Sequence, residues 1–319
     1  MSNRMRAARA RGLIAISVAA VATLIAVVPA SGRGAAYESG DVIVADSVNN
    51  AIKAVDPVSG AASTVSSGGN FVFPADVTFD EDGDILVVDR DAFGGRGGII
   101  RIDSATATQT PVSSNAISEA AGGKELFRHP IALDRKGGSL FVADYAPPRK
   151  IIKVNVATGK QALISKDDEM NSPFGIVADG VDKPLVSDAG AFRNGGVLKI
   201  NPDTGKQIEV SKNGKFKYPQ MLTLFGSNSA LVTDTDSFEA EGAIFRVNLR
   251  TGAQKTIARG GPINNPSGIA LLDDDTAVVA DYTTPFPKGG VYRVDLETGD
   301  QTPLNTTDLY NPIGIRIAP

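Results

Sequence analysis

The segment 173–188, PFGIVADGVDKPLVSD, decides the fold because its layout returns along the chain. It opens on a proline, passes through one short apolar run, and ends a second apolar run on Asp188. The segment 266–281, PSGIALLDDDTAVVAD, repeats this layout, again with 15 positions from the proline to the aspartate. Two short apolar runs separated by turn residues predict an antiparallel pair of buried strands.

The same unit recurs six times. Its opening prolines have a mean spacing of about 47.6 residues, since five intervals cover the distance from 74 to 312. They are Pro74, Pro130, Pro173, Pro219, Pro266 and Pro312. After the aspartate comes a β-rich run, then a turn such as Thr204-Gly205, then a fourth run. Ala107 replaces the turn glycine in one unit, so we expect a different hairpin there. Four short strands per unit, without helical periodicity, predict the blade of a β-propeller.

The two ends of the chain complete one blade together. Residues 41–66 have the later strands of a unit, including Asp46 at the aspartate position, but they lack an opening proline strand. The segment 311–317 provides such a strand and then the chain stops. Pairing the two pieces removes the exposed sheet edges. The sequence therefore predicts an all-β, six-bladed propeller over residues 41–319, preceded by a short segment, 31–40.

The units share a pattern: Pro-x-Gly-Ile, then an apolar-Val-Ala-Asp run, then a basic residue between β-formers. This pattern resembles that of the NHL-repeat and TolB-like six-bladed propellers. The chain is also similar to senescence-marker-protein/gluconolactonase-like, strictosidine-synthase-like and streptogramin-lyase-like proteins. The resemblance covers roughly residues 41–319 and implies the fold. These relatives include enzymes, ligand carriers and protein-binding scaffolds, so it leaves the function open.

The first 30 residues have the pattern of an export signal. Four arginines precede the apolar run Leu13–Val28, and Val28-Pro29-Ala30 is a candidate cleavage site. This order is typical of a secretory signal peptide; retention as a membrane anchor is the alternative, although the run is shorter than a bilayer span of about 20 residues. We expect a bacterial protein that is secreted, periplasmic or on the cell surface, with no membrane insertion after cleavage.

Composition excludes several classes of site. The chain has no Cys and one His, so disulfides, thiolate metal sites and multi-histidine metal sites are ruled out. The net charge is −4, and removal of the four arginines in residues 1–30 changes it to −8. An acidic surface disfavours nucleic acid and anionic membranes as partners. The expected partners are a small molecule or an extracellular protein, bound by a monomer.

An aspartate ends the second strand of every unit. A ring of carboxylates could bind Ca²⁺. The alternative, which repetition in every unit favours, is that each carboxylate accepts hydrogen bonds from nearby backbone. The set is Asp46, Asp89, Asp144, Asp188, Asp234 and Asp281.

Residues beside the opening prolines should line the mouth of the central channel. Asp76 stands where other units have Gly, and it is a candidate catalytic residue and metal ligand, or else a solvated channel wall. His129 is the only side chain whose ordinary pKa lies near neutrality, and it is the second catalytic candidate. Tyr218 and Gln220 flank Pro219 as candidate ligand-binding residues. The resemblance to gluconolactonase-like enzymes implies an Asn after such a proline and a metal-binding acid in another blade; none of the six positions after a proline is Asn or acidic.

The loops after the aspartates are rich in aromatic and basic residues. We expect them to share a face with the segments before the prolines, as a recognition surface or as packing against the blade tops. The candidates for ligand binding are Phe93, Arg96, Tyr145, Phe192, Arg193, Phe238, Tyr282 and Phe286. One interval is longer than the rest because of residues 114–127, which predict a short helix or lid, or an inert excursion.

Two functions are the main candidates at this point, and a purely structural envelope protein is a third possibility. The first is a secreted propeller that binds a small ligand or a protein through its aromatic loop face, with no demonstrable catalytic site. The alternative is a hydrolase or lyase at the channel mouth, centred on Asp76 with His129 or Gln220 nearby. It would depend on Ca²⁺ or another divalent cation; no cofactor is otherwise implied.

Overall fold

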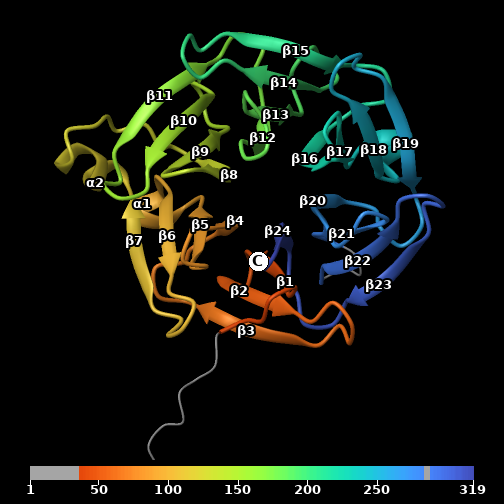
Figure 1. Ribbon diagram of the computed structural model, residues 1–319, viewed down its shortest axis with the longest axis horizontal. Helices are drawn as coiled ribbons and strands as arrows, with labels where there is room; N and C mark the ends of the chain where they lie inside the picture. Colours follow the sequence, from red (N-terminus) through yellow and green to blue (C-terminus); the bar gives the residue numbers. More distant parts are fainter. Residues whose placement is uncertain (1–35, 284–287) are drawn as a thin grey trace, which may run out of the picture. The chain divides into compact units, whose positions relative to one another are not determined.

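The computed structural model describes residues 36–283 and 288–319, and these residues form six four-stranded antiparallel sheets around a central axis (Figure 1). The prediction of a six-bladed β-propeller is confirmed. The signal-like segment 1–30 lies outside the described residues. Within the segment 31–40, Tyr37 packs on Phe79, with ring centroids 5.6 Å apart. No helix among the described residues is long and apolar enough to cross a membrane.

Each blade runs from an inner strand at the channel to an outer strand at the rim (Figure 1). Blade A is β24 (Pro312–Ile317), β1 (Val42–Asp46), β2 (Ala51–Val55) and β3 (Ala62–Ser67); blade B is β4 (Pro74–Phe79), β5 (Ile85–Asp89), β6 (Gly98–Ile102) and β7 (Gln109–Ser113); blade C is β8 (Pro130–Lys136), β9 (Ser139–Asp144), β10 (Lys150–Asn155) and β11 (Gln161–Lys166). Blade D is β12 (Pro173–Val177), β13 (Leu185–Asp188), β14 (Gly196–Ile200) and β15 (Gln207–Lys212); blade E is β16 (Pro219–Phe225), β17 (Ser229–Asp234), β18 (Ala243–Asn248) and β19 (Gln254–Arg259); blade F is β20 (Pro266–Leu271), β21 (Thr276–Asp281), β22 (Gly290–Asp295) and β23 (Gln301–Asn305). The connections hold the short helices α1 (Ala92–Gly95), α2 (Asn115–Ala120) and α3 (Ser237–Ala240).

The ring closes through the two ends of the propeller. The C-terminal strand β24 pairs with β1, so that Ile317 faces Val42 and Ile315 faces Val44. Blade A is therefore assembled from both ends of the domain, as the incomplete first unit predicts.

The second strand of each blade is mainly apolar up to its final aspartate because both of its faces are buried. In β5, Leu86 and Val88 pack into one cluster with blades C and D, whereas Ile85 and Val87 pack into another with blade A. Alternate side chains of a strand point to opposite faces, so a strand between two packed neighbours needs an uninterrupted apolar run.

The opening prolines lie at the channel edge of each sheet. Proline has no N–H to donate, and it is tolerated at the start of an edge strand. Each inner strand also has a register irregularity within the first few residues after its proline. Glycine in the preceding blade accommodates the proline ring: a Cβ at Gly97 would lie 2.4 Å from Pro130 Cδ, and a Cβ at Gly289 would lie 2.1 Å from Pro312 Cδ.

Glutamine side chains join consecutive blades at the rim, a feature that the sequence analysis missed. Gln254, which opens β19 of blade E, donates to Ser211 Oγ of β15 in blade D at 2.9 Å. It also accepts from Lys215 N (2.7 Å) and donates to Asn213 O (3.0 Å), both in the connection that follows β15. The available signal was the sequence Thr-Gly-x-Gln in four hairpins and its variant Thr-Ala-Thr-Gln at residues 106–109. Equivalent glutamines that bond to the preceding blade or its connection are Gln109, Gln161, Gln207 and Gln301.

The expectation of a different hairpin at Ala107 is wrong. Ala107 takes a φ of 60°, and its N–H donates to Asp103 O at 2.8 Å, as that of Gly159 does to Asn155 O. Cross-strand pairing imposes the left-handed conformation although alanine disfavours it.

The long interval contains the expected helix, α2, capped by the Ser114 side chain, which accepts from Ile117 N at 3.2 Å. The helix lies at the outer rim beside β7 and β11, away from the channel mouth (Figure 1).

Candidate functional site

The repeated aspartates fix the loops of one face of the propeller. Asp188 is fully buried and accepts hydrogen bonds from Asn171 N and Ser172 N, both at 2.8 Å, and from Gly190 N and Ala191 N, at 2.9 and 2.8 Å. The carboxylate thus holds together the segment before its own blade's inner strand and the loop after its second strand. Burial raises the pKa of Asp188, and the four N–H donors oppose that rise.

All six aspartates accept from the segment before the inner strand of their own blade. The backbone donors for Asp46, Asp89, Asp144, Asp188, Asp234 and Asp281 belong to Tyr310, Val72, Arg128, Asn171, Lys217 and Asn264. We refer to this arrangement as the aspartate clamp. Because backbone donors occupy the carboxylates, the clamp accounts for the repeat without a metal ion.

Four rings form a continuous row on the face that the clamps organise. Successive ring centroids of His129, Tyr145, Phe174 and Tyr218 lie 5.7, 5.7 and 5.6 Å apart. The rings come from blades C, D and E, and all four residues are half-buried. We call these four residues the aromatic row.

Local sequence explains how the row is assembled. His129 immediately precedes Pro130 and Tyr145 immediately follows Asp144, so one clamp positions both; Tyr145 N also donates to His129 O at 3.3 Å. Phe174 follows Pro173, next to the irregularity at the start of β12. Sequence reasoning selected His129, Tyr145 and Tyr218 but not Phe174. The sequence feature that could have identified Phe174 is that it is the only aromatic residue directly after one of the six opening prolines.

A cation and exposed apolar groups extend the same face into blade B. The guanidinium carbon of Arg90 lies 3.6 Å from the centroid of the Phe73 ring, and its Nη2 lies 2.6 Å from Asp91 Oδ2. Val72, the residue before Phe73, is 52% exposed. An Arg stacked on an aromatic ring beside an exposed aliphatic side chain is typical of interface cores.

Two phenols continue the face into blades E and F. Burial raises the pKa of Tyr218, and the Asp236 carboxylate raises it further. The same two causes, in the same order, raise the pKa of Tyr282. Both phenols therefore remain protonated at neutral pH and can donate hydrogen bonds to a bound partner.

The loop phenylalanines Phe93, Phe192 and Phe238 do not join the row. Each has a φ between 51 and 53°, in the left-handed region. This backbone folds the Phe93 ring over Gly98 and the Phe192 ring over Gly196, where a Cβ would lie 2.4 and 2.7 Å from the rings. The Phe93 and Phe192 rings therefore pack against their own blades, and whether these loops also recognise a ligand stays a prediction.

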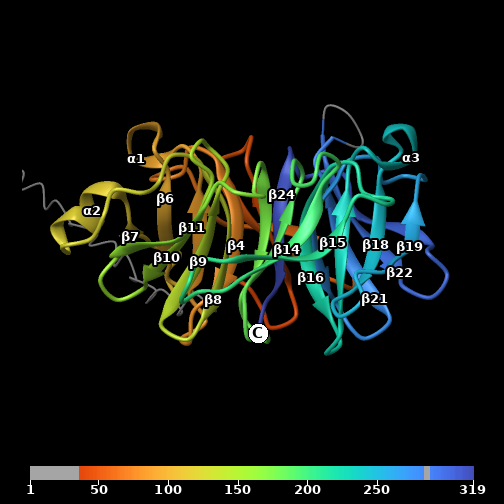
Figure 2. The same ribbon diagram turned by 90° about the horizontal axis from the view of Figure 1, so that it is seen from above.

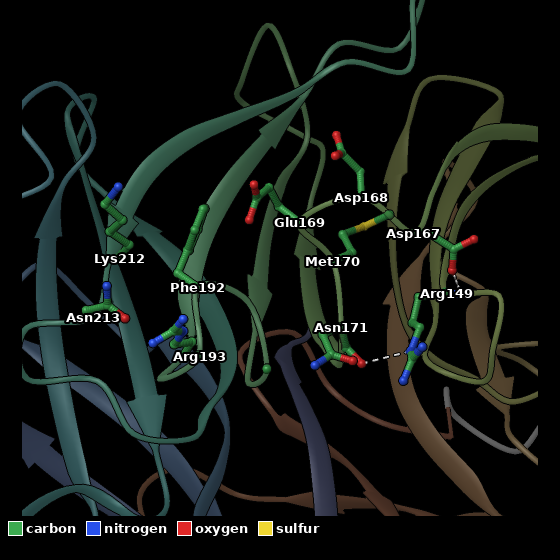
Figure 3. Close-up of a pocket in the computed structure, with 11 residues that line it drawn as sticks. Arg149, Asp167, Asp168, Glu169, Met170, Asn171, Phe192, Arg193, Lys212 and Asn213 are labelled. Carbon is green, nitrogen blue, oxygen red and sulfur yellow. Dashed lines mark hydrogen bonds between the residues drawn. The ribbon is translucent and has the colours of Figure 1, made fainter.

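The three loops instead border cavities at the rim, between adjacent blades. Phe192 and Arg193 line the largest, of about 720 Å³, between blades C and D (Figure 3). Phe238 lines one of about 660 Å³, and Phe93 with Arg96 lines one of about 480 Å³. Figure 2 shows α1 and α3, which contain Phe93 and Phe238, at the outer part of this face. Phe286 lies outside the described residues.

Asp76 is buried in the channel wall, which corrects the expectation of a solvated group. It is 4% exposed, and its Oδ1 and Oδ2 accept from Val77 N (2.9 Å) and from Leu133 N (3.2 Å) of the next blade. Burial raises its pKa to about 6, although the nearby Arg316 guanidinium favours the ionised form.

A charge pair deeper in the channel was also missed. Arg316 Nη2 of blade A lies 3.2 Å from Asp134 Oδ1 of blade C, and Asp134 Oδ2 accepts from Ala178 N at 2.8 Å. The group around Asp76 thus joins inner strands of four blades. Its contacts are structural: backbone donors and one guanidinium satisfy the carboxylates.

The described residues do not bring a set of acidic or histidine side chains together at the channel mouth. Among residues 36–283 and 288–319, no three His, Asp or Glu side chains are grouped closely enough to hold a metal ion. Gln220 is half-buried, and its backbone carbonyl accepts a hydrogen bond from Ser187 Oγ. His129 contributes its ring to the aromatic row rather than pairing with Asp76.

Comparison with known proteins supports the fold alone. No family model and no curated protein sequence matches the chain. A chain of the crystal structure of a nidogen/laminin complex matches with a TM-score of 0.65 and 17% identity, over 88% of this chain and 98% of that one. TolB from Acinetobacter baumannii matches with a TM-score of 0.62 and 13% identity, over 86% of this chain and 66% of TolB. The protein is a six-bladed β-propeller that resembles these two; more specific relationships to NHL-repeat or gluconolactonase-like proteins stay predictions.

Proposed function

We propose that this protein is an exported binding protein that holds a protein partner on the face carrying the aromatic row. The observation that supports this best is the continuous set of half-exposed rings contributed by blades C, D and E. Rigid aromatic side chains lose little conformational entropy on binding, and with Arg they dominate the energetics of protein interfaces.

The form of the face favours a protein over a small molecule. Small-molecule sites are concave, with polar groups that fix the orientation of the ligand. The cavities described above lie at the rim, and no residue of the aromatic row lines them. An open row bordered by Arg90 and Val72 suits a broad contact. The structural resemblance to a propeller in a complex of nidogen and laminin is consistent with this use of the fold.

The alternative of a metal-dependent hydrolase or lyase has no observation in its favour. Asp76 is buried and bonded to two backbone N–H groups, and the side chains around it are Arg316 and Asp134 rather than a set of open ligands. We therefore propose binding as the function.

Site-specific photocrosslinking tests the proposal in cells that produce the protein. A photoreactive phenylalanine analogue at Tyr145 should give one discrete adduct with a partner protein. The matched control places the same analogue at Ile208, an exposed side chain on the outer strand β15. An adduct from both positions, or from neither, would contradict the proposal.

The identified partner then allows a quantitative test. Phe174→Ala should weaken its affinity about 30-fold, as expected for truncation of a central aromatic residue worth about 2 kcal/mol. Val58→Ala, at an 86% exposed position of a hairpin, should leave the affinity unchanged. Equal effects of the two substitutions would place the contact elsewhere.

A further inference from the structure

The cavity between blades C and D carries charges of both signs on facing walls (Figure 3). Asp168 and Glu169, from the connection between β11 and β12, lie on one wall. Asp167 and Arg149 border the same side, where Arg149 N donates to Asp167 Oδ1 at 3.1 Å and Arg149 Nε donates to Asn171 O at 2.9 Å. Arg193, from the loop after β13, and Lys212, at the end of β15, form the other. The cavity measures about 720 Å³, within the range of about 300–1,000 Å³ that small-molecule sites occupy.

Two of these charged residues occupy strained backbone positions. Asp168 has a φ of 60°, and Arg193 has a φ of 77°. A residue with a Cβ costs about 1–2 kcal/mol in the left-handed region, whereas glycine adopts it freely. Five of the eleven residues lining this cavity are non-glycine residues with positive φ, so strain is concentrated here.

Other blades of the same chain show that these positions do not need charged residues. Five residues before an opening proline, where blade D has Asp168, the chain has Gly69, Gly214 and Gly261 in three other connections. After the loop phenylalanine, where blade D has Arg193, blade B has Gly94 and blade E has Glu239, which also has a positive φ. The fold therefore tolerates glycine at both places. Charged residues at these two positions are therefore not needed for the fold, and together they place opposite charges on one cavity.

The side chains at these positions are also free to bind. Asp168 and Arg193 are exposed, and neither side chain has a hydrogen-bond or ion-pair partner within residues 36–283 and 288–319. Glu169 is within electrostatic reach of Lys212, which pairs with Glu209 at 2.8 Å. The Phe192 ring and the buried Met170 add apolar surface to the lining.

We propose that this cavity binds a zwitterionic ligand of the short-peptide class. A guanidinium binds a carboxylate through two parallel hydrogen bonds, and the facing carboxylates accept from an ammonium group. A simple anion would meet repulsion from Asp168 and Glu169, and a simple cation would meet it from Arg193 and Lys212. A dipeptide with an apolar side chain satisfies both walls and contacts Phe192. This site is separate from the aromatic row and does not rest on the proposed partner face.

Calorimetric titration with the dipeptide Ala-Phe at low salt tests the site directly. We expect binding with a Kd of about 1 mM or tighter. Acetyl-Ala-Phe lacks the ammonium group and Ala-Phe-amide lacks the carboxylate, so each should bind about tenfold more weakly. Absence of binding by Ala-Phe, or equal binding of the blocked peptides, would overturn the proposal.

Two variants separate binding from folding. R193G and D168G install residues that other blades already have at these strained positions, so both should melt at the wild-type temperature or above it. Each should weaken Ala-Phe binding about tenfold. The matched control E239G relieves the same kind of strain in blade E, where φ is 64°, and should leave binding unchanged. Unchanged binding by R193G and D168G, or a loss with E239G, would refute the assignment.

Discussion

The Asp46 carboxylate accepts a hydrogen bond at 3.1 Å from the backbone N–H of Tyr310, 264 positions later in the chain. In the other blades the equivalent donor lies at most 17 positions before the aspartate. In blade A the aspartate clamp therefore links the two ends of the domain and fixes the C-terminal strand β24 against β1.

Asp46→Ala should lower the free energy of unfolding by about 3 kcal/mol, because it leaves the half-buried Tyr310 N–H without this acceptor and weakens ring closure. Urea denaturation measures the loss. Asp82→Ala provides the control, since Asp82 is exposed and its carboxylate makes no hydrogen bond among the described residues. Similar effects of the two substitutions would show that the clamp does not hold β24.

Asp76 should make stability depend on pH in an unusual direction. Its pKa is about 6 in the folded protein and 3.8 as the ordinary value, so between these values the folded state binds more protons than the unfolded state. The free energy of unfolding contributed by this group therefore falls as the pH rises from about 4 to above 6, by up to about 3 kcal/mol. Arg316 on β24 and Asp134 on β8 are the charges that act on it.

Asp76→Asn removes this titration with little change in volume. Melting temperatures of both proteins are measured at pH 5 and pH 7.5. Other titrating groups contribute equally to the two proteins, so the difference in melting temperature between wild type and variant isolates the effect of Asp76. The wild-type melting temperature, relative to that of the variant, should be higher at pH 5 than at pH 7.5. A difference that is constant with pH, or of opposite sign, would refute the buried, desolvated state of Asp76.

Ala107→Gly should stabilise the protein by about 1 kcal/mol, because glycine adopts the φ of 60° found here without steric cost. Ala105→Gly, in the same hairpin but without a positive φ, should be slightly destabilising. Chemical denaturation of both variants gives the comparison. Destabilisation by Ala107→Gly would mean that the alanine side chain makes contacts that outweigh its strain.

Gln254→Ala should cost about 2 kcal/mol, since three hydrogen bonds between blades D and E are lost and Lys215 N loses its acceptor. Lys255→Ala, at the next and exposed position of β19, should change stability little. If the two variants unfold at the same urea concentration, the glutamines do not join the blades energetically.

Sequence patterns predicted the strands, the blade number and the ring closure well, because buried strands need uninterrupted apolar runs and the period counts the blades. The candidate site was predicted less completely. The aromatic loops were recognised, but Phe93, Phe192 and Phe238 received the same weight as Tyr145. Phe174, Arg90 and Gln254 carried weaker signals, since each makes its contact with residues that are distant in sequence or brought close only by the loop geometry.

Residue order alone thus determined the architecture, since hydrogen bonding and apolar periodicity act over a few neighbouring positions and repeat in each blade. Only the tertiary structure decided which rings meet, because Tyr145, Phe174 and Tyr218 are brought together by the angle between adjacent blades. It also decided that Phe192 turns towards the rim, where a left-handed backbone directs its ring, and that Asp168 and Arg193 face one cavity. Side-chain direction depends on backbone torsion angles and on the packing of the blades, and the spacing of residue types predicts neither.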